Sequence, residues 1–188
     1  MFFLMLALLF IPKKYVGSDW LFSVLVPVSC LAALSGDFFM LNPNKPKSAI
    51  AGGLSFAIEH ILNLVMIVFL LSAHGVALPW YVYLIIPCAL ILLALIGGKI
   101  LNDKSKGFAV AYFGIHLTLL IFAIVLTIKG APKDYTLSFA LIGYVLFIIS
   151  DTILAVSIIK GHEKRPDFYV MLTYLTAQLF IYLTFCQF

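Results

Sequence analysis

Long apolar runs are the feature that most constrains how this chain can fold. A membrane-spanning helix needs about 20 apolar residues at a rise of about 1.5 Å per residue, and six runs meet that length. They cover residues 20–41, 48–72, 78–98, 107–128, 135–159 and 168–187. A further run over residues 1–12 is followed by Lys13 and Lys14, and it is too short to cross a bilayer unless it is tilted or truncated.

The pattern predicts an all-α, polytopic transmembrane helix bundle with six clear spans and a short first one. The composition agrees, since 64% of the residues are hydrophobic and only 11% are charged, against roughly 25% charged in soluble domains. These values exclude a soluble globular protein, and also a disordered chain, which combines low hydrophobicity with high charge. Seven spans would use roughly 140 residues, so residues 1–188 are expected to form a single transmembrane helical domain.

The positions of Lys and Arg predict the orientation of the bundle. Eight of the 12 lie in or beside the loops that follow the runs 20–41, 78–98 and 135–159, and four lie on the opposite side. The positive-inside rule assigns the richer side to the cytoplasm, which suits a bacterial inner membrane and an endoplasmic reticulum equally. A net charge of only +4, with lysines scattered between apolar runs, argues against a nucleic-acid partner. Nothing in the sequence sets an oligomeric state.

Three of the eight acidic residues lie inside apolar runs, namely Asp37, Glu59 and Asp151. An ionisable group inside a bilayer is costly unless it faces a partner or a polar cavity, so each is a candidate functional residue. Counted from the cytoplasmic ends of their runs, Asp151 lies about 12 Å deep, Asp37 about 6 Å deep, and Glu59 near the midplane. The other five acidic residues are expected to be solvated loop charges: Asp19, Asp103, Asp134, Glu163 and Asp167.

Other polar residues fall in the same half of the bilayer as these carboxylates. They are His60 and Asn63 near Glu59, Tyr112 and His116 in the run 107–128, and Tyr174 and Gln178 in the last run. Tyr174 and Gln178 are one helical turn apart and therefore share a face. Isolated structural hydrogen bonds need not share a depth, so the pattern predicts a water-containing pocket that opens toward the cytoplasmic leaflet. The alternative is that these side chains only bond neighbouring helices, with His116 packed in the core.

Three segments resemble the motifs of a known family, the lysoplasmalogenase (YhhN-like) membrane proteins. Ser35-Gly36-Asp37, then Gly53-Leu54-Ser55-Phe56 leading to His60, resemble its SGD…GxxF…H core. The segment from Gly143 to Ala155 resembles its G-x-x-L-F-x-x-S-D-x-x-L-A pattern, and Tyr174 to Gln178 resembles its closing Y-x-x-A-Q. The similarity runs from about residue 30 to the C-terminus. The family usually has eight spans, and this chain has Glu59 and Asn63 where a small residue and a tyrosine are expected, which leaves the substrate preference open.

The resemblance implies a membrane-embedded hydrolase that acts on lysoplasmalogens, and we expect it to use no cofactor or metal. It would cleave the vinyl-ether bond to give a fatty aldehyde and glycerophosphoethanolamine or glycerophosphocholine. This cleavage begins with protonation of the β-carbon, and water then attacks the resulting oxocarbenium ion, much as in glycosidases that use two carboxylates. It needs one carboxylic acid that is protonated near neutral pH and a second that is ionised. Burial raises the pKa of a carboxyl group, and a nearby like charge separates the pKa values of two carboxyls.

We therefore expect Asp151 to be the general acid and Asp37 to be the base or the group that stabilises the cation, with the two roles exchangeable. His60 would orient one of these carboxyl groups or the attacking water. The expected substrate-binding residues are Glu59, Asn63, Ser150, Tyr174 and Gln178.

Two other functions are compatible with acids inside a membrane. A metal-dependent lipid hydrolase could use His60, His116 and an aspartate around zinc, but no HExxH or similarly tight ligand spacing is present. A proton-coupled transporter is an equally natural setting for midplane acids, but inverted repeats and broken helices in matching positions are not found.

Overall fold

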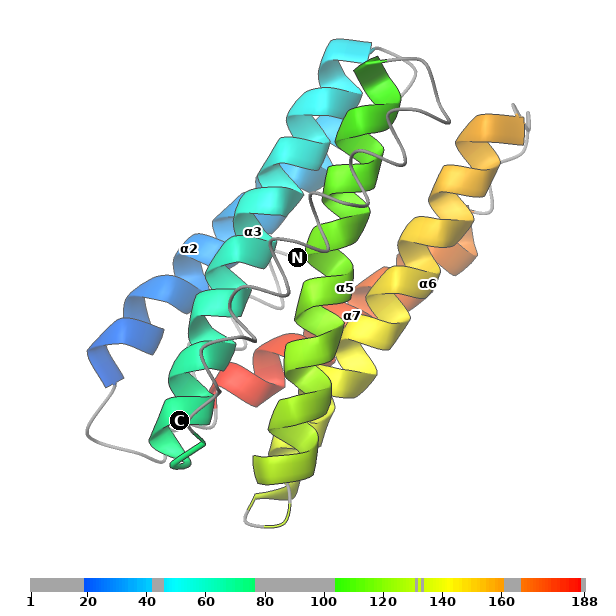
Figure 1. Cartoon of the computed structure of the whole chain (residues 1–188). Helices are drawn as coiled ribbons and strands as arrows, with labels where there is room; N and C mark the ends of the chain where they lie inside the picture. Colours follow the sequence, from blue (N-terminus) through cyan, green and yellow to red (C-terminus); the bar gives the residue numbers. More distant parts are fainter. Residues whose placement is uncertain are drawn as a thin grey trace. The chain divides into compact units, whose positions relative to one another are not determined.

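The computed structural model describes residues 19–41, 46–76, 104–130, 132, 134–160 and 167–186 (Figure 1). These residues form five long α-helices and one short 3₁₀ helix, and no strand occurs among them. The elements are α2 (Asp19–Met40), α3 (Pro46–Ala73), α5 (Lys104–Gly130), η1 (Tyr135–Leu137), α6 (Ser138–Lys160) and α7 (Asp167–Cys186).

The five long helices correspond to five of the predicted spans. Each is long and apolar enough to cross a membrane, so the described part of the chain is an all-helical, multi-pass membrane protein. The predicted spans 1–12 and 78–98 lie outside the described residues. The predicted run 135–159 differs at its start, where the first three residues form η1 before α6 begins.

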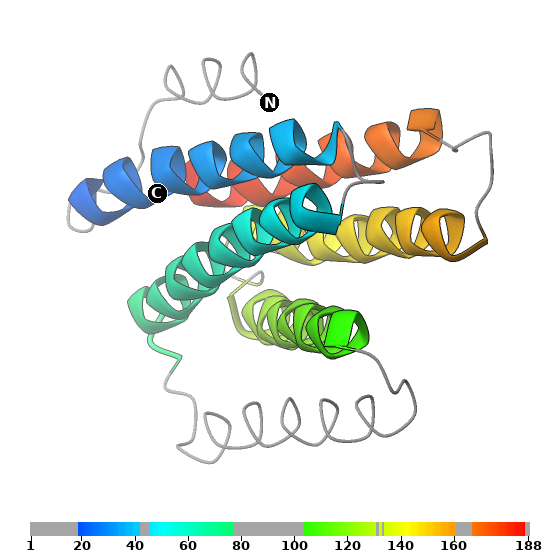
Figure 2. The same cartoon turned by 90° about the horizontal axis from the view of Figure 1, so that it is seen from above.

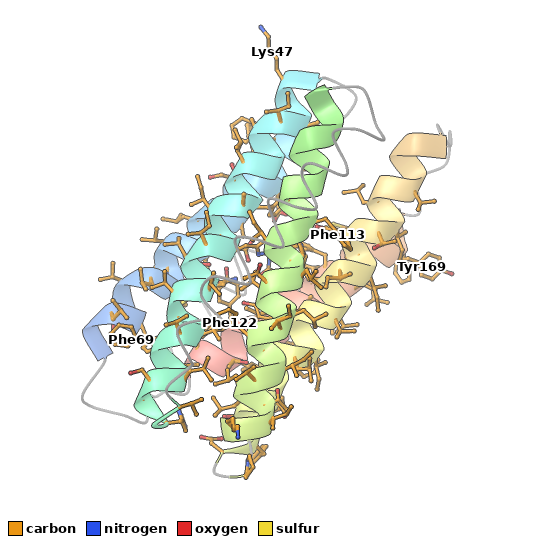
Figure 3. The ribbon with its side chains drawn as sticks, viewed as in Figure 1. Lys47, Phe69, Phe113, Phe122 and Tyr169 are labelled. Atoms are coloured by element: carbon orange, nitrogen blue, oxygen red, sulfur yellow. The ribbon has the colours of Figure 1, made fainter. Side chains whose placement is uncertain are left out.

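Large apolar side chains cover the outside of these helices. Phe113 on α5 is 52% exposed and Tyr169 on α7 is 64% exposed. Figure 3 shows Tyr169 pointing away from its helix and Lys47 extending beyond the first turn of α3. An apolar outer surface is unfavourable in water but is matched to lipid chains, which agrees with helices that span a membrane.

The chain divides into two compact units, of which the first comprises Met1–Cys30 and Ala123–Phe188. In this unit α6 and α7 run side by side in opposite directions, and η1 contacts both (Figures 1 and 2). The part of α2 in this unit also meets α7. The hydroxyl groups of Ser29 and Tyr182 are 3.2 Å apart and form a hydrogen bond, and the rings of Phe22 and Phe185 stack with centroids 6.4 Å apart.

Gly143 allows the close approach of α6 and α7. A Cβ atom on this residue would lie 2.6 Å from Cγ1 of Ile181 and 3.0 Å from the carbonyl oxygen of Ala177. Small residues at such crossings are typical of membrane helices, whose backbones associate through van der Waals packing. The glycine that opens the Gly143–Ala155 motif therefore has a packing role.

The second unit is Leu31–Phe122, which contains the last part of α2, all of α3 and most of α5. Gly36 of α2 packs against the ring of Phe56 of α3, because a Cβ atom on Gly36 would lie 2.7–2.9 Å from three ring carbons. The Ser48 hydroxyl of α3 also donates a hydrogen bond of 2.7 Å to the carbonyl of Phe39 in α2. The SGD and GxxF motifs are therefore in contact through Gly36 and Phe56.

Asp134 corrects one expectation from the sequence. It is not a solvated loop charge but is only 8% exposed, and it serves as the N-cap of η1. Its Oδ1 atom accepts hydrogen bonds from the backbone N–H of Thr136 at 3.0 Å and from the Thr136 hydroxyl at 2.6 Å. The prediction was wrong because the first N–H groups of a helix have no partner within the helix, and a carboxylate placed there is drawn in to accept from them.

We expect Asp134→Ala to lower the free energy of unfolding by about 0.5–2 kcal/mol, the usual effect of removing an N-cap. Asp134→Asn keeps an oxygen that can accept from Thr136 and should retain most of the stability. Thermal unfolding of the two variants in the same detergent measures the difference. If the two variants unfold at the same temperature as the wild type, the cap contributes nothing.

Candidate functional site

Buried polar side chains of α3 and α5 form a cluster in the second unit. Glu59, His60 and Asn63 of α3 are all fully buried, and His116 of α5 is 2% exposed. Glu59 and Asn63 are one turn apart on the helix, and the Asn63 amide donates to Oε1 of Glu59 at 3.4 Å. Isolated polar groups in apolar helices are costly, so such a cluster is a candidate functional site.

The two histidines of this cluster are in direct contact. The Nε2 atoms of His60 and His116 are 3.1 Å apart, and the rings meet edge to face with centroids separated by 4.4 Å. The Nδ1 atom of His116 is 3.0 Å from the carbonyl oxygen of Tyr112, one turn earlier in α5. The Tyr112 ring lies 4.6 Å from the His116 ring and 6.0 Å from the His60 ring, centroid to centroid.

Asp37 also belongs to the second unit. It follows Gly36 in α2 and is partly buried. The hydroxyl of Ser35, in the same motif, donates to the Leu31 carbonyl of its own helix at 2.8 Å, which satisfies that donor locally. The contact between Gly36 and Phe56 therefore sets how closely α3 approaches the backbone beside Asp37.

The remaining predicted site residues lie in the first unit, on α6 and α7. Ser150 is 1% exposed, and its hydroxyl donates to the Val170 carbonyl of α7 at 3.1 Å. Its neighbour Asp151 is partly buried, and the Oδ2 atom of Asp151 is inaccessible to solvent. Tyr174 is 6% exposed and Gln178 is fully buried, so the shared face of α7 turns inward. The Tyr174 ring packs edge to face on Phe147 with centroids 5.5 Å apart.

The structure therefore groups the predicted residues by unit. Glu59, His60 and Asn63 lie together on α3 in the unit that contains Asp37, whereas Asp151 belongs to the other unit. Sequence reasoning missed the hydrogen bond between His60 and His116. These residues are 56 positions apart on different helices, and the sequence connected them only by their similar depth and as possible zinc ligands.

A metal centre requires a set of ligands that converge. In the part of the chain that the structure describes, no group of three or more His, Cys, Asp or Glu side chains could hold a metal ion. His60 and His116 supply two imidazoles, but three of their four ring nitrogens take part in the hydrogen bonds described above. The zinc-hydrolase alternative therefore gains no support from these residues.

Comparison with known proteins gives one match. The model of the YhhN family matches residues 1–185, a range that includes every predicted site residue. No curated protein and no solved structure matches the chain. The family match confirms the family resemblance inferred from the sequence.

Proposed function

We propose, since the chain belongs to the YhhN family, that it is a membrane-embedded hydrolase of lysoplasmalogens. It would cleave the vinyl-ether bond to release a fatty aldehyde and glycerophosphoethanolamine or glycerophosphocholine. The observation that best supports this proposal is the presence of carboxylates inside membrane-spanning helices. Asp37 lies in the candidate span Leu21–Met40 and Asp151 in the candidate span Tyr135–Leu154.

The depth of Asp37 suits the substrate. In a lysoplasmalogen the vinyl-ether bond joins the glycerol oxygen to the first carbons of the chain, so it lies just below the head group. Asp37 is three residues before the end of its candidate span, about 5 Å at the helical rise, whereas Asp151 is nine residues before the end of α6 at Lys160, about 14 Å. In the predicted orientation both of these ends are cytoplasmic, so we propose that the substrate enters from the cytoplasmic leaflet.

The proposed reaction uses one carboxylic acid and one carboxylate. Asp151 donates its proton to the β-carbon, the π electrons form the new C–H bond, and the ether oxygen shares the positive charge of the oxocarbenium ion. Water adds to the α-carbon and loses a proton, which gives a hemiacetal. The hemiacetal then breaks its bond to the glycerol oxygen, which takes up a proton, and the aldehyde is released. Asp37 either accepts the proton of the water or stabilises the cation, as carboxylates do in glycosidases.

The other polar residues would hold the substrate and the water. Glu59, Asn63, Ser150, Tyr174 and Gln178 are buried and offer hydrogen-bonding groups in helices that are otherwise apolar. A buried donor or acceptor that pairs with the glycerol oxygens would favour substrates that carry them, because leaving it unpaired costs free energy. We propose no cofactor for this chemistry, because proton transfer and water suffice.

The proposal predicts aldehyde release from a vinyl-ether lysolipid but not from its saturated alkyl-ether analogue. The two lipids share head group and chain length, and only the vinyl ether forms an oxocarbenium ion on protonation. Detergent-purified protein should produce aldehyde in proportion to protein concentration, measured with a coupled aldehyde dehydrogenase. Absence of aldehyde from folded protein would contradict the proposal, and flux across liposomes would then test the transporter alternative.

A further inference from the structure

The hydrogen bonds of the buried pair His60 and His116 indicate which of their ring nitrogens carry a hydrogen. A backbone carbonyl only accepts hydrogen bonds, so the 3.0 Å contact between Nδ1 of His116 and the Tyr112 carbonyl requires a hydrogen on that Nδ1. A neutral imidazole carries one such hydrogen. The Nε2 atom of neutral His116 is therefore an acceptor.

This assignment determines the state of His60 as well. Its Nε2 atom is 3.1 Å from Nε2 of His116, and this contact holds a single hydrogen. Since His116 accepts there, the hydrogen belongs to Nε2 of His60. The lone pair of neutral His60 is then on Nδ1, because which nitrogen carries the proton is set by the hydrogen bond of the other.

The opposite direction of the bond is unfavourable. It would need hydrogens on both nitrogens of His116, and therefore an imidazolium ion on a side chain that is only 2% exposed. Burying such a charge is costly unless an opposite charge compensates it. Hydrogens on both Nε2 atoms would also point two donors at each other across 3.1 Å.

We propose that His116 is a positioning residue that holds His60 in the Nε2–H tautomer, and that Nδ1 of His60 is the nitrogen of the pair that accepts a proton. This role rests on the proposed function, in which the water that attacks the oxocarbenium ion must lose a proton. The O–H bond of the water breaks, the Nδ1–H bond of His60 forms, and the electron pair left on oxygen completes the new C–O bond. Asp37 is then left to stabilise the cation.

His60 is fully buried, so a positive charge on it during the reaction needs stabilising neighbours. The protonated ring keeps its Nε2–H bond to His116, and a hydrogen bond with one charged partner is stronger than a neutral one. The Tyr112 ring lies beside both histidines, with its centroid 6.0 Å from that of His60 and 4.6 Å from that of His116. The hydrogen bond between the two rings can therefore persist when His60 takes up the proton.

Nitrogen-15 NMR of the full-length protein, labelled on its histidines and held in detergent, tests the tautomers without substrate. Protonated and unprotonated ring nitrogens have well-separated chemical shifts. We expect His60 to carry its hydrogen on Nε2 and His116 to carry its hydrogen on Nδ1. His74 supplies an internal reference, since its Nδ1 also faces a backbone carbonyl, that of Leu70, at 2.8 Å.

Variants of His116 show whether the pairing causes the tautomer. His116→Phe removes the acceptor, and His60 should then populate both tautomers, whereas the amide oxygen of His116→Gln can replace Nε2 and should restore the Nε2–H form. Tyr112→Phe is the matched control, because it keeps both the ring and the carbonyl and should leave the tautomer unchanged. A hydrogen on Nδ1 of wild-type His60, or a His60 tautomer unaffected by His116→Phe, would overturn the assignment. A loss of the expected shifts after chelation would do so too, because it would make the pair metal ligands.

Kinetics then separate this inference from the proposed function. If the enzyme is active, His116→Phe should reduce kcat about 10–100-fold with little change in KM. This loss is smaller than that expected from removing a general base, and His116→Gln should restore most of the wild-type kcat. Equal losses in the two variants, with both folded, would overturn the positioning role. If the wild type releases no aldehyde but shows the expected nitrogen shifts, the tautomer assignment stands and the catalytic role of the pair is overturned together with the proposed function.

Discussion

Replacing Asp151 by Asn is expected to abolish aldehyde release from a vinyl-ether lysolipid while the protein stays folded. The amide has the shape of the carboxyl group but cannot donate its proton, and loss of a general acid typically costs about 10²–10⁴ in rate. Because the two side chains have nearly the same shape, the change creates no cavity around the partly buried Asp151 in α6. The kcat of purified variant and wild type in the same micelles measures the effect.

Thr152 provides the matched control for Asp151. It is the next residue of α6, is exposed, and donates its hydroxyl only to the Ile148 carbonyl of its own helix at 2.7 Å. Thr152→Ala should therefore leave both turnover and thermal stability close to those of the wild type. Near-complete activity in Asp151→Asn would show that Asp151 is not the general acid, whichever role Asp37 has.

Gly143→Ala is expected to produce the largest loss of stability of any single-methyl change considered for this chain. The added Cβ would lie 3.0 Å from the backbone nitrogen of Ile181 and from the carbonyl oxygen of Ala177, and 2.6 Å from Cγ1 of Ile181. Backbone atoms cannot rotate away, so α6 and α7 would have to separate. Overpacking of this kind costs about 1–3 kcal/mol or more, which exceeds the gain of roughly 1 kcal/mol from the better helix propensity of Ala.

Gly52→Ala is the control for this steric argument. It makes the same chemical change inside a helix, but its nearest neighbours are Cγ and Sδ of Met40 at 3.0 and 3.3 Å, which belong to a flexible side chain. We expect Gly52→Ala to melt near the wild-type temperature and Gly143→Ala to melt well below it in the same detergent. Equal melting temperatures in the two variants would show that the close approach of α6 and α7 does not contribute to stability.

The helices could be predicted from the sequence because their lengths follow from the thickness of the bilayer. Runs of about 20 apolar residues have few alternatives to a spanning helix, so the described helices begin and end within a few residues of the predicted runs. The start of α6 is different, because Asp134 reads as a loop charge and only becomes a cap when the backbone of η1 presents its N–H groups. Local hydrogen bonding determines where this helix begins, and the hydropathy pattern carries no information about such bonds.

Relations within one helix were also accessible, whereas relations between helices were not. The spacing of Glu59 and Asn63 predicts their proximity, and they share a hydrogen bond of 3.4 Å. The contacts of His60 with His116, and of Ser150 with the Val170 carbonyl, depend on how each helix is rotated about its axis. Helices that are apolar on every side give no stripe from which this rotation can be inferred.

The glycines of the family motifs show the same limit. In the sequence, Gly36 and Gly143 are recognised only as parts of the family motifs, and their packing role is not evident. In the structure each permits a close contact, Gly36 with the Phe56 ring and Gly143 with α7. Each of these glycines also lies on the helix that carries one of the candidate catalytic aspartates, so the motifs combine a packing residue with a chemical one.

Turnover of a vinyl-ether lysolipid by the purified protein in D₂O tests the central claim most directly. Protonation of the β-carbon takes its hydrogen from solvent through the acid, so the aldehyde should carry one deuterium on the carbon next to its carbonyl group. Mass spectrometry of the trapped aldehyde detects this deuterium, and formation of the labelled aldehyde should require Asp151. Aldehyde without the deuterium would contradict cleavage by protonation, and failure of the folded protein to release any aldehyde would contradict the proposed function.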